Sequence, residues 1–247
     1  MSMSELVKSI HEKYLSTLDK IAAAAVRAGR DPKSVKLVVV TKSQPLEIVQ
    51  AAIEAGAQIL GENYPDEGVT KIQSLHEYSA VEWHMIGHVQ SRKAQLVARN
   101  FNLLHSLDGL KLANRLDRFC GEAGRTLPTL LEFNVGGEES KSGWPAWDER
   151  LWPELLSDVA AVLALPHLQV RGLMAMPPIG DHAEFSRPFF QKMKRLQEFF
   201  TAQFPEASFS DLSMGTTTDF EVAVEEGATF VRVGTAIVGP RKYTTED

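Results

Sequence analysis

Short apolar runs alternate with amphipathic helical patterns along almost the whole chain. Runs without polar alternation are typical of strands that are buried on both faces of a parallel sheet. The sequence predicts such strands at residues 35–41, 58–61, 82–86, 103–105, 129–134, 168–175, 208–212 and 230–233. Apolar residues at three-to-four spacing predict the intervening helices at residues 45–55, 66–78, 91–99, 109–123, 150–164, 183–203 and 218–226.

A further amphipathic helix is predicted ahead of the first strand, at about residues 4–28, where Gly29 suits its end. Strict alternation of strand and helix favours an α/β fold, a single (β/α)8 TIM-type barrel with an extra N-terminal helix, over an open doubly wound sheet. No G-x-G-x-x-G motif follows the first strand, which counts against a dinucleotide-binding sheet. We expect one domain over residues 1–247, with the barrel at about 35–241.

The composition narrows the class of protein. The chain of 247 residues is 44% hydrophobic and 23% charged, which is ordinary for a globular protein. Its single cysteine, Cys120, lies in a helical pattern where core packing is expected; it excludes an intramolecular disulfide and fits a reducing cytoplasm. The formal charge of −6 and the lack of a basic tract, signal layout or long apolar stretch predict a cytoplasmic protein with no nucleic-acid or membrane partner.

Lys42 follows the apolar run of the first predicted strand, separated from it only by Thr41. Lysine is rarely buried without a partner. Desolvation at the mouth of a barrel would disfavour its ammonium form and leave the amine available to condense with an aldehyde. The alternative is a lysine that only marks where the strand meets water.

Glycine and hydroxyl residues follow the last two predicted strands, where barrels often bind phosphate. Residues 213–219 read Ser-Met-Gly-Thr-Thr-Thr-Asp, and Gly234-Thr235 follows the eighth strand. Glycine permits close backbone approach to an anion, and hydroxyl groups donate hydrogen bonds to it. The alternative is that residues 213–219 cap the next helix. Together with Lys42, these loops favour a small phosphorylated aldehyde as ligand.

Residues at the ends of other predicted strands are further candidates for contacts with the ligand. Arg232 is either a structural ion-pair partner or a positive charge facing the ring nitrogen of a bound pyridine, where it would oppose protonation. Asn63 could orient a ring hydroxyl, and His84 is either near the bound ligand or a hydrogen-bonded core residue. Lys141 lies in a polar loop, at residues 136–143, that we expect to be mobile near the mouth. No zinc-ligand spacing and no G-x-S-x-G motif is present, so we predict no metal site and no hydrolase.

Seven motifs, in order along the chain, resemble those of the pyridoxal 5′-phosphate (PLP) homeostasis proteins, barrel-only relatives of the N-terminal domain of bacterial alanine racemase. They are residues 38–42, 61–64, 83–87, 137–143, 172–174, 212–215 and 231–237. The resemblance implies PLP as cofactor, held as an internal aldimine on Lys42. It also implies contacts to the phosphate from Ser213, Gly215, Gly234 and Thr235. Contacts to the pyridine ring or elsewhere in the pocket are implied for Arg232, Asn63, His84 and Met174. Departures from the family pattern at Pro65-Asp66, Arg92 and Thr216-Thr217 remove none of these contacts.

Two functions remain, a PLP-binding protein that buffers or delivers the cofactor without catalysis, and a PLP-dependent amino-acid racemase. Alanine racemases use a second, β-rich domain and a tyrosine that serves as the second base. This sequence ends about seven residues after Pro240, and of its tyrosines only Tyr64 follows a predicted strand. We therefore favour the carrier and assign no catalytic residue. Lys141 is a candidate secondary acceptor that takes the aldehyde from Lys42 during release. Apo PLP-dependent enzymes are the expected recipients, and we expect a monomer.

Overall fold

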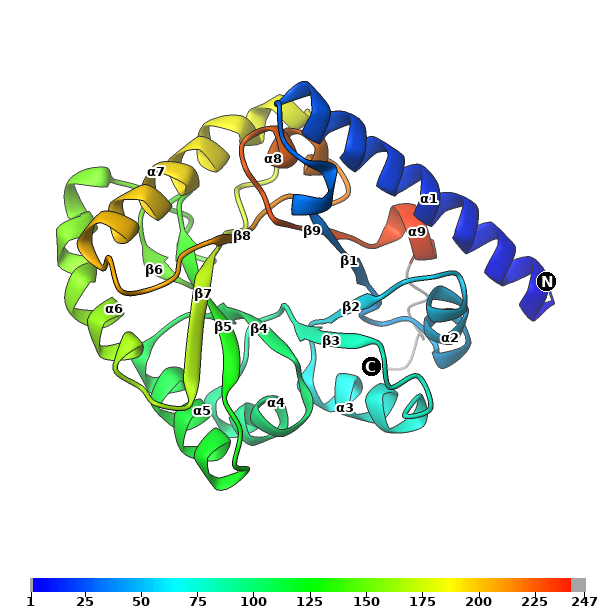
Figure 1. Ribbon diagram of the computed structural model, residues 1–247, viewed down its shortest axis with the longest axis horizontal. Helices are drawn as coiled ribbons and strands as arrows, with labels where there is room; N and C mark the ends of the chain where they lie inside the picture. The colour runs from blue at the N-terminus through cyan, green and yellow to red at the C-terminus, as the bar shows by residue number, and fades with distance from the viewer. Residues whose placement is uncertain (1, 241–247) are drawn as a thin grey trace.

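A closed barrel of parallel strands forms the centre of the molecule, in the computed structural model that describes residues 2–240 (Figure 1). Hydrogen bonds connect the strands in the order β4-β3-β2-β1-β9-β8-β7-β5, and a pairing between β4 and β5 closes the ring. The predicted (β/α)8 barrel is therefore confirmed. The predicted end of the barrel at Arg241, and Tyr243, lie outside the described residues. The barrel strands are β1 (Lys36–Val40), β2 (Ile59–Glu62), β3 (Glu82–Met85), β4 (Leu103–Leu107), β5 (Leu127–Asn134), β7 (Leu168–Met174), β8 (Asp211–Ser213) and β9 (Phe230–Val233).

Helices surround the barrel on its outer side (Figure 1). They cover apolar side chains that point outward from the strands and form a continuous core with them. The α-helices are α1 (Met3–Arg27), α2 (Leu46–Glu54), α3 (Pro65–Ser74), α4 (Ala94–Asn100), α5 (Leu110–Glu122), α6 (Leu156–Leu163), α7 (Arg187–Gln203), α8 (Phe220–Glu225) and α9 (Thr235–Val238). None of the helices within residues 2–240 is both long and apolar enough to cross a membrane.

The extra N-terminal helix, α1, lies across the outside of the barrel against α2, α8 and α9 (Figure 1). It starts at a capping box, in which the Ser2 hydroxyl accepts from the Glu5 backbone and the Glu5 carboxylate accepts from Ser2. Its buried stripe includes Ile10, Ile21 and Ala24. The helix spans Met3–Arg27, close to the predicted 4–28.

Several predicted elements differ in detail from those observed. The helix predicted at 150–164 starts as a 3-10 segment, Glu149–Leu155, which contains Pro153, a residue that cannot donate a backbone hydrogen bond. The strand predicted at 208–212 begins only at Asp211, because the Phe209 carbonyl accepts from the Gln197 side chain of α7 instead of a neighbouring strand. A two-residue strand, β6 (Trp144–Pro145), pairs with β5 and was not predicted.

The interior of the barrel is filled by a small apolar cluster and a pair of histidines. Val38, Leu130 and Phe230 belong to this cluster, and the His84 and His105 rings pack edge-on against Phe230. Side chains therefore fill the barrel interior toward the amino ends of the strands. The space for a ligand lies at the carboxyl ends of the strands.

Candidate functional site

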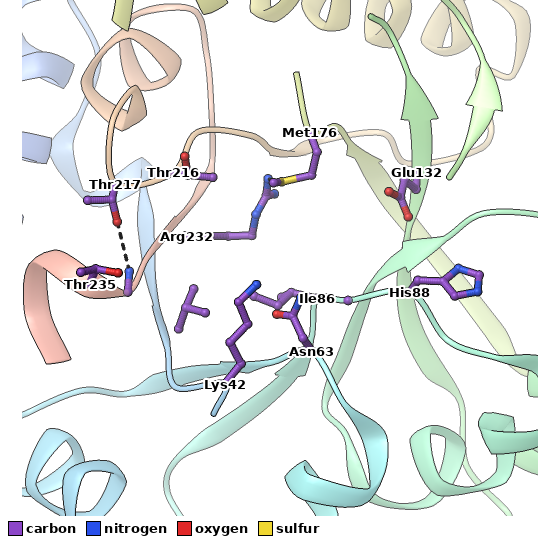
Figure 2. A pocket seen from close by; sticks show the side chains of 13 residues that line it. Lys42, Asn63, Ile86, His88, Glu132, Met176, Thr216, Thr217, Arg232 and Thr235 are labelled. Atoms are coloured by element: carbon purple, nitrogen blue, oxygen red, sulfur yellow. Dashed lines mark hydrogen bonds between the residues drawn. The ribbon is translucent and has the colours of Figure 1, made fainter. Parts of the chain in front are cut away.

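A pocket of about 330 Å³ opens above the barrel core (Figure 2). Its walls come from the carboxyl ends of β1, β2, β3, β5, β7, β8 and β9 and from the residues that follow them. Polar and apolar groups alternate around it. The lining residues are Val40, Lys42, Asn63, Ile86, Gly87, His88, Glu132, Met176, Thr216, Thr217, Arg232, Gly234 and Thr235.

Lys42 and Arg232 extend into this pocket from different walls (Figure 2). Lys42 lies two residues after β1, in a turn that precedes α2 and is closed by a hydrogen bond from Gln44 N–H to the Thr41 carbonyl. The next residue, Ser43, has a φ of 56°, in the left-handed region that non-glycine residues seldom adopt. The sequence placed this lysine at the barrel mouth, and the structure has it there.

The guanidinium of Arg232 is buried and fixed by three contacts. Nη1 donates to the Ser213 hydroxyl at 2.5 Å, and Nη2 lies 3.0 Å from the Ala175 carbonyl and 2.8 Å from Met176 Sδ. Burial lowers the pKa of Arg232 to about 10, while Glu132 and Asp219 oppose that shift. The side chain therefore stays positively charged at neutral pH. Within residues 2–240 no ion pair to it is found, so the structural ion-pair alternative is not supported.

A chain of hydrogen bonds runs from Arg232 down through the barrel interior. The Ser213 hydroxyl lies 2.8 Å from His105 Nδ1, His105 Nε2 lies 3.0 Å from His84 Nδ1, and His84 Nε2 lies 3.1 Å from Glu82 Oε2. Burial lowers the pKa of both histidines, so both are neutral.

The direction of each bond in this chain follows from the Glu82 end. The His84 hydrogen bond lowers the pKa of the Glu82 carboxyl, which is therefore an acceptor, so His84 Nε2 donates and His84 Nδ1 accepts. His105 Nε2 must then donate and its Nδ1 accept, which leaves the Ser213 hydroxyl to donate downward while it accepts from Arg232. Every donor in the chain has one acceptor, and the Arg232 guanidinium is held in a single orientation.

Glu132 forms the wall of the pocket opposite Thr217 and Thr235 (Figure 2). Its side chain comes from β5 and is 8% exposed. Burial raises its pKa to about 7, with a smaller contribution from the Asp108 carboxylate, while Arg232 opposes the shift. Its Oε2 is buried and has no hydrogen-bond partner among the described residues.

Hydroxyl groups and backbone of two loops form the wall on the other side. Thr216 and Thr217 follow β8, while Gly234 and Thr235 follow β9, and the Gly234 N–H lies 3.4 Å from the Thr217 hydroxyl (Figure 2). A Cβ at Gly234 would lie 3.2 Å from the carbonyl oxygen of Val40, so a side chain there would crowd the backbone of β1, and glycine relieves this close approach.

The structure brings five of the predicted residues together at the pocket and places four elsewhere. Lys42, Asn63, Arg232, Gly234 and Thr235 line it. The other four lie beneath it or behind it, because their side chains or backbone pack against the barrel core. His84 and Met174 lie in the barrel interior. The Ser213 hydroxyl is hydrogen-bonded to Arg232 and His105. The Gly215 carbonyl accepts from the Arg232 backbone N–H, and a Cβ at Gly215 would point at Ala223 of α8.

Several lining residues were not among the predicted ones. Met176 lies two residues beyond the Met174 that was predicted, whereas Thr216 and Thr217 belong to the predicted loop 213–219 but were not singled out in it. Glu132 lies in the segment Leu130-Leu-Glu-Phe-Asn134, and the sequence does not show whether its side chain faces into the barrel or out of it. Its only signal is that a carboxylate is unusual in a strand buried on both faces.

The loop that contains Lys141 is anchored at its base. The Asn134 side-chain amide donates to the Glu138 carbonyl at 2.8 Å and accepts from the Gly137 N–H at 2.9 Å. Lys141 Nζ lies 3.9 Å from the Glu138 carboxylate, and the side chain is not among those that line the pocket. Among the described residues, no cluster of three metal-ligating side chains occurs.

Comparison with known proteins shows the family to which the chain belongs. Residues 17–242 match the family model of the alanine racemase N-terminal domain. The pyridoxal phosphate homeostasis protein of Vibrio alginolyticus is 38% identical over 241 residues, which are 96% of this chain and 100% of that protein. The chain belongs to the pyridoxal phosphate homeostasis protein family. The homologue from Escherichia coli K12 is 39% identical over 92% of this chain and 94% of its own.

Solved structures of relatives have the same architecture. PipY of Synechococcus elongatus, solved with PLP bound, is 33% identical and superposes with a TM-score of 0.78 over 93% of this chain and all of that chain. A protein from Bifidobacterium adolescentis is 31% identical, with a TM-score of 0.85 over 94% of this chain and 96% of its own. An alanine racemase from Clostridium difficile, at 12% identity and a TM-score of 0.66 over 93% of this chain and 56% of that chain, shares the fold alone.

Proposed function

We propose that this protein binds pyridoxal 5′-phosphate in the pocket and serves PLP homeostasis by holding and delivering the cofactor without catalysing a reaction. The observation that carries the proposal is the presence of Lys42 in one pocket with a buried, charged Arg232 and a wall of hydroxyl and glycine residues. The names of the homologues and the PLP-bound PipY structure support it. Residues 1–247 form one cofactor-binding domain in this proposal, in a monomeric cytoplasmic protein whose recipients are apo PLP-dependent enzymes.

The residues present fit this cofactor. When bound, PLP supplies an aldehyde that condenses with a primary amine, and Lys42 is the amine in the pocket. Thr216, Thr217, Gly234 and Thr235 would hold the phosphate, since hydroxyl groups and a glycine backbone bind anions well. Buried polar atoms without partners among the described residues, Asn63 Oδ1 and Glu132 Oε2, are left to interact with polar groups of a ligand.

Arg232 gives the pocket its electronic character. Its guanidinium remains charged, is fixed by Ser213 and the Ala175 carbonyl, and would oppose protonation of a pyridine nitrogen brought next to it. A pyridine that stays neutral is a weak electron sink, so the pocket favours holding the cofactor over carbanion chemistry.

A PLP-dependent amino-acid racemase is the second candidate, and one observation favours it. Two-base racemisation needs an acid or base on each face of the substrate. Lys42 could serve one face, and Glu132, whose pKa is raised to about 7, is a carboxyl on another wall of the same pocket. Chiral analysis of L-alanine incubated with PLP-loaded protein separates the two functions: we expect no D-alanine above the level of free PLP, and formation of D-alanine that Glu132→Gln abolishes would establish the racemase.

Binding itself is tested by titrating dialysed protein with PLP and following the absorbance of the bound cofactor. We expect saturable binding by the wild type and an affinity at least about tenfold weaker for Lys42→Ala, because the covalent bond is lost. Lys36→Ala, a lysine on the same strand but at its opposite end, is the matched control and should bind as the wild type does. Equal binding by Lys42→Ala would contradict the proposal.

A further inference from the structure

A buried charged network lies beside the Lys42 turn, between β2 and α3. The Lys71 ammonium on α3 donates hydrogen bonds to the Thr41 carbonyl at 2.7 Å, to Glu62 Oε1 at 2.8 Å and to Glu67 Oε1 at 2.6 Å. An ammonium group has three N–H donors, so all of them are used. The Lys71 side chain is 7% exposed and that of Glu62 is fully buried, so removing Lys71 leaves a buried carboxyl without its cationic partner, whereas removing Glu67 leaves the Lys71–Glu62 pair in place.

Two bonds of this network hold the backbone on both sides of Lys42. The Thr41 carbonyl, which accepts from Lys71, belongs to the peptide group before Lys42. The Ser43 N–H, which donates to Glu67 Oε1 at 2.7 Å, belongs to the peptide group after it. Because each peptide group is planar, fixing both of them fixes the φ and ψ angles of Lys42 and the direction in which its side chain leaves the backbone.

The backbone of this turn includes an unfavourable conformation at Ser43, and hydrogen bonds from neighbouring residues stabilise it. Ser43 has a φ of 56°, which costs a serine on the order of 1 kcal/mol, and its bond to Glu67 offsets that strain. Thr41 is fixed three times, through its carbonyl, through its N–H to the Gly61 carbonyl at 3.0 Å, and through its hydroxyl to Glu62 Oε1 at 2.6 Å.

We propose that Glu67 and Lys71 are positioning residues for Lys42. Neither residue lines the pocket, and both act by fixing the two peptide groups from which the reactive side chain projects. This inference rests on the proposed function, since it assigns a purpose to the turn only if Lys42 reacts with an aldehyde. A purely structural network would affect stability and leave the reaction of the folded protein unchanged.

The test measures how fast Lys42 reacts in each variant. Protein is mixed with PLP, samples are reduced with borohydride at successive times, and the fraction of modified Lys42 peptide is measured by mass spectrometry. Glu67→Ala removes the bond to Ser43, and we expect its Lys42 to react about tenfold more slowly, since small misplacements of a reacting group are costly. Glu67→Gln keeps an acceptor oxygen and should react within about twofold of the wild type.

Asp66→Ala is the matched control, because Asp66 is the adjacent carboxylate on α3, and within residues 2–240 its partner outside α3 is the Lys93 ammonium. It should react at the wild-type rate. Lys71→Met removes the bond to Thr41 and gives a second variant that should slow the reaction in the same direction; circular dichroism and urea unfolding establish that each variant is folded.

The outcomes separate the two proposals. A wild-type rate in folded Glu67→Ala or Lys71→Met, or equal slowing by Asp66→Ala, would overturn the positioning role. If the wild type itself formed no adduct on Lys42, the proposed function would fail instead.

Discussion

At the scale of single residues, the pocket combines a charged arginine with a buried carboxyl that is easily kept neutral. Arg232 has all its visible hydrogen bonds to uncharged acceptors, whereas Glu132 has an oxygen with no partner in the described part of the chain. An unpaired carboxylate in this environment is expensive, so its proton is retained to a higher pH. This residue makes the protein's stability depend on pH.

Replacing Glu132 with glutamine should remove that dependence. The folded-state pKa, at about 7, lies above the ordinary value of 4.5, so the native state binds a proton more tightly than the unfolded chain does. The stabilising contribution is therefore fully present below pH 4.5 and is lost as the pH rises through 7. Relative to Glu132→Gln, the wild type should lose on the order of 2–3 kcal/mol of unfolding free energy between pH 4.5 and 8.

Urea unfolding of both proteins at several pH values measures this difference. We expect the unfolding free energies of the two proteins, plotted against pH, to diverge between pH 4.5 and 8. Parallel curves would show that Glu132 titrates with its ordinary pKa, and that its unpartnered oxygen is hydrated in solution.

At the scale of elements, the pocket walls are the ends of strands and the loops that follow them, and one of the longer loops carries Lys141. The loop after β5 contains Lys141 and is tied down at its start through Asn134, while Ser142 Oγ lies 3.3 Å from His88 Nδ1. His88 lines the pocket, so the far end of the loop contacts the wall of the proposed cofactor site. The residue next to Lys141 therefore contacts a residue that lines the pocket.

If Lys141 takes the aldehyde from Lys42 during release, its replacement should slow delivery of PLP. We expect Lys141→Ala to transfer cofactor to an apo PLP-dependent enzyme several-fold more slowly than the wild type, because an alternative amine is lost. Recovery of recipient activity over time measures the transfer. Lys141→Arg keeps the positive charge without a reactive amine and should be as slow as Lys141→Ala; transfer at the wild-type rate by either variant would contradict this role.

The element scale also shows what the sequence could predict of the site. Lys42, Asn63 and Arg232 were expected at the pocket because polar residues at the ends of apolar strands are conspicuous, and Gly234 because a phosphate needs close backbone approach; all four line it. Glu132 was missed because a strand in a closed barrel turns successive side chains inward and outward, and the sequence alone does not show which set faces in. The same ambiguity placed Met174 at the pocket, whereas it belongs to the apolar cluster of the interior, and His84 follows the alternative of a hydrogen-bonded core residue.

At the scale of the whole molecule, the fold was predictable because eight strands and the helices between them must alternate to close a barrel. The exceptions are local. The Phe209 carbonyl bonds to a helix side chain and shortens β8, and Pro153 turns the start of one predicted helix into a 3-10 segment. Neither change lies at the carboxyl end of a strand, so the loops that form the pocket converge where the predicted barrel requires.

The proposed binding of PLP depends on one covalent reaction, at Lys42. The most direct test is to mix the purified protein with PLP, reduce with borohydride and map the modified peptide by mass. The account predicts one reduced adduct on Lys42, absent from Lys42→Ala. Scattered labelling of surface lysines, or an adduct that survives in Lys42→Ala, would contradict it.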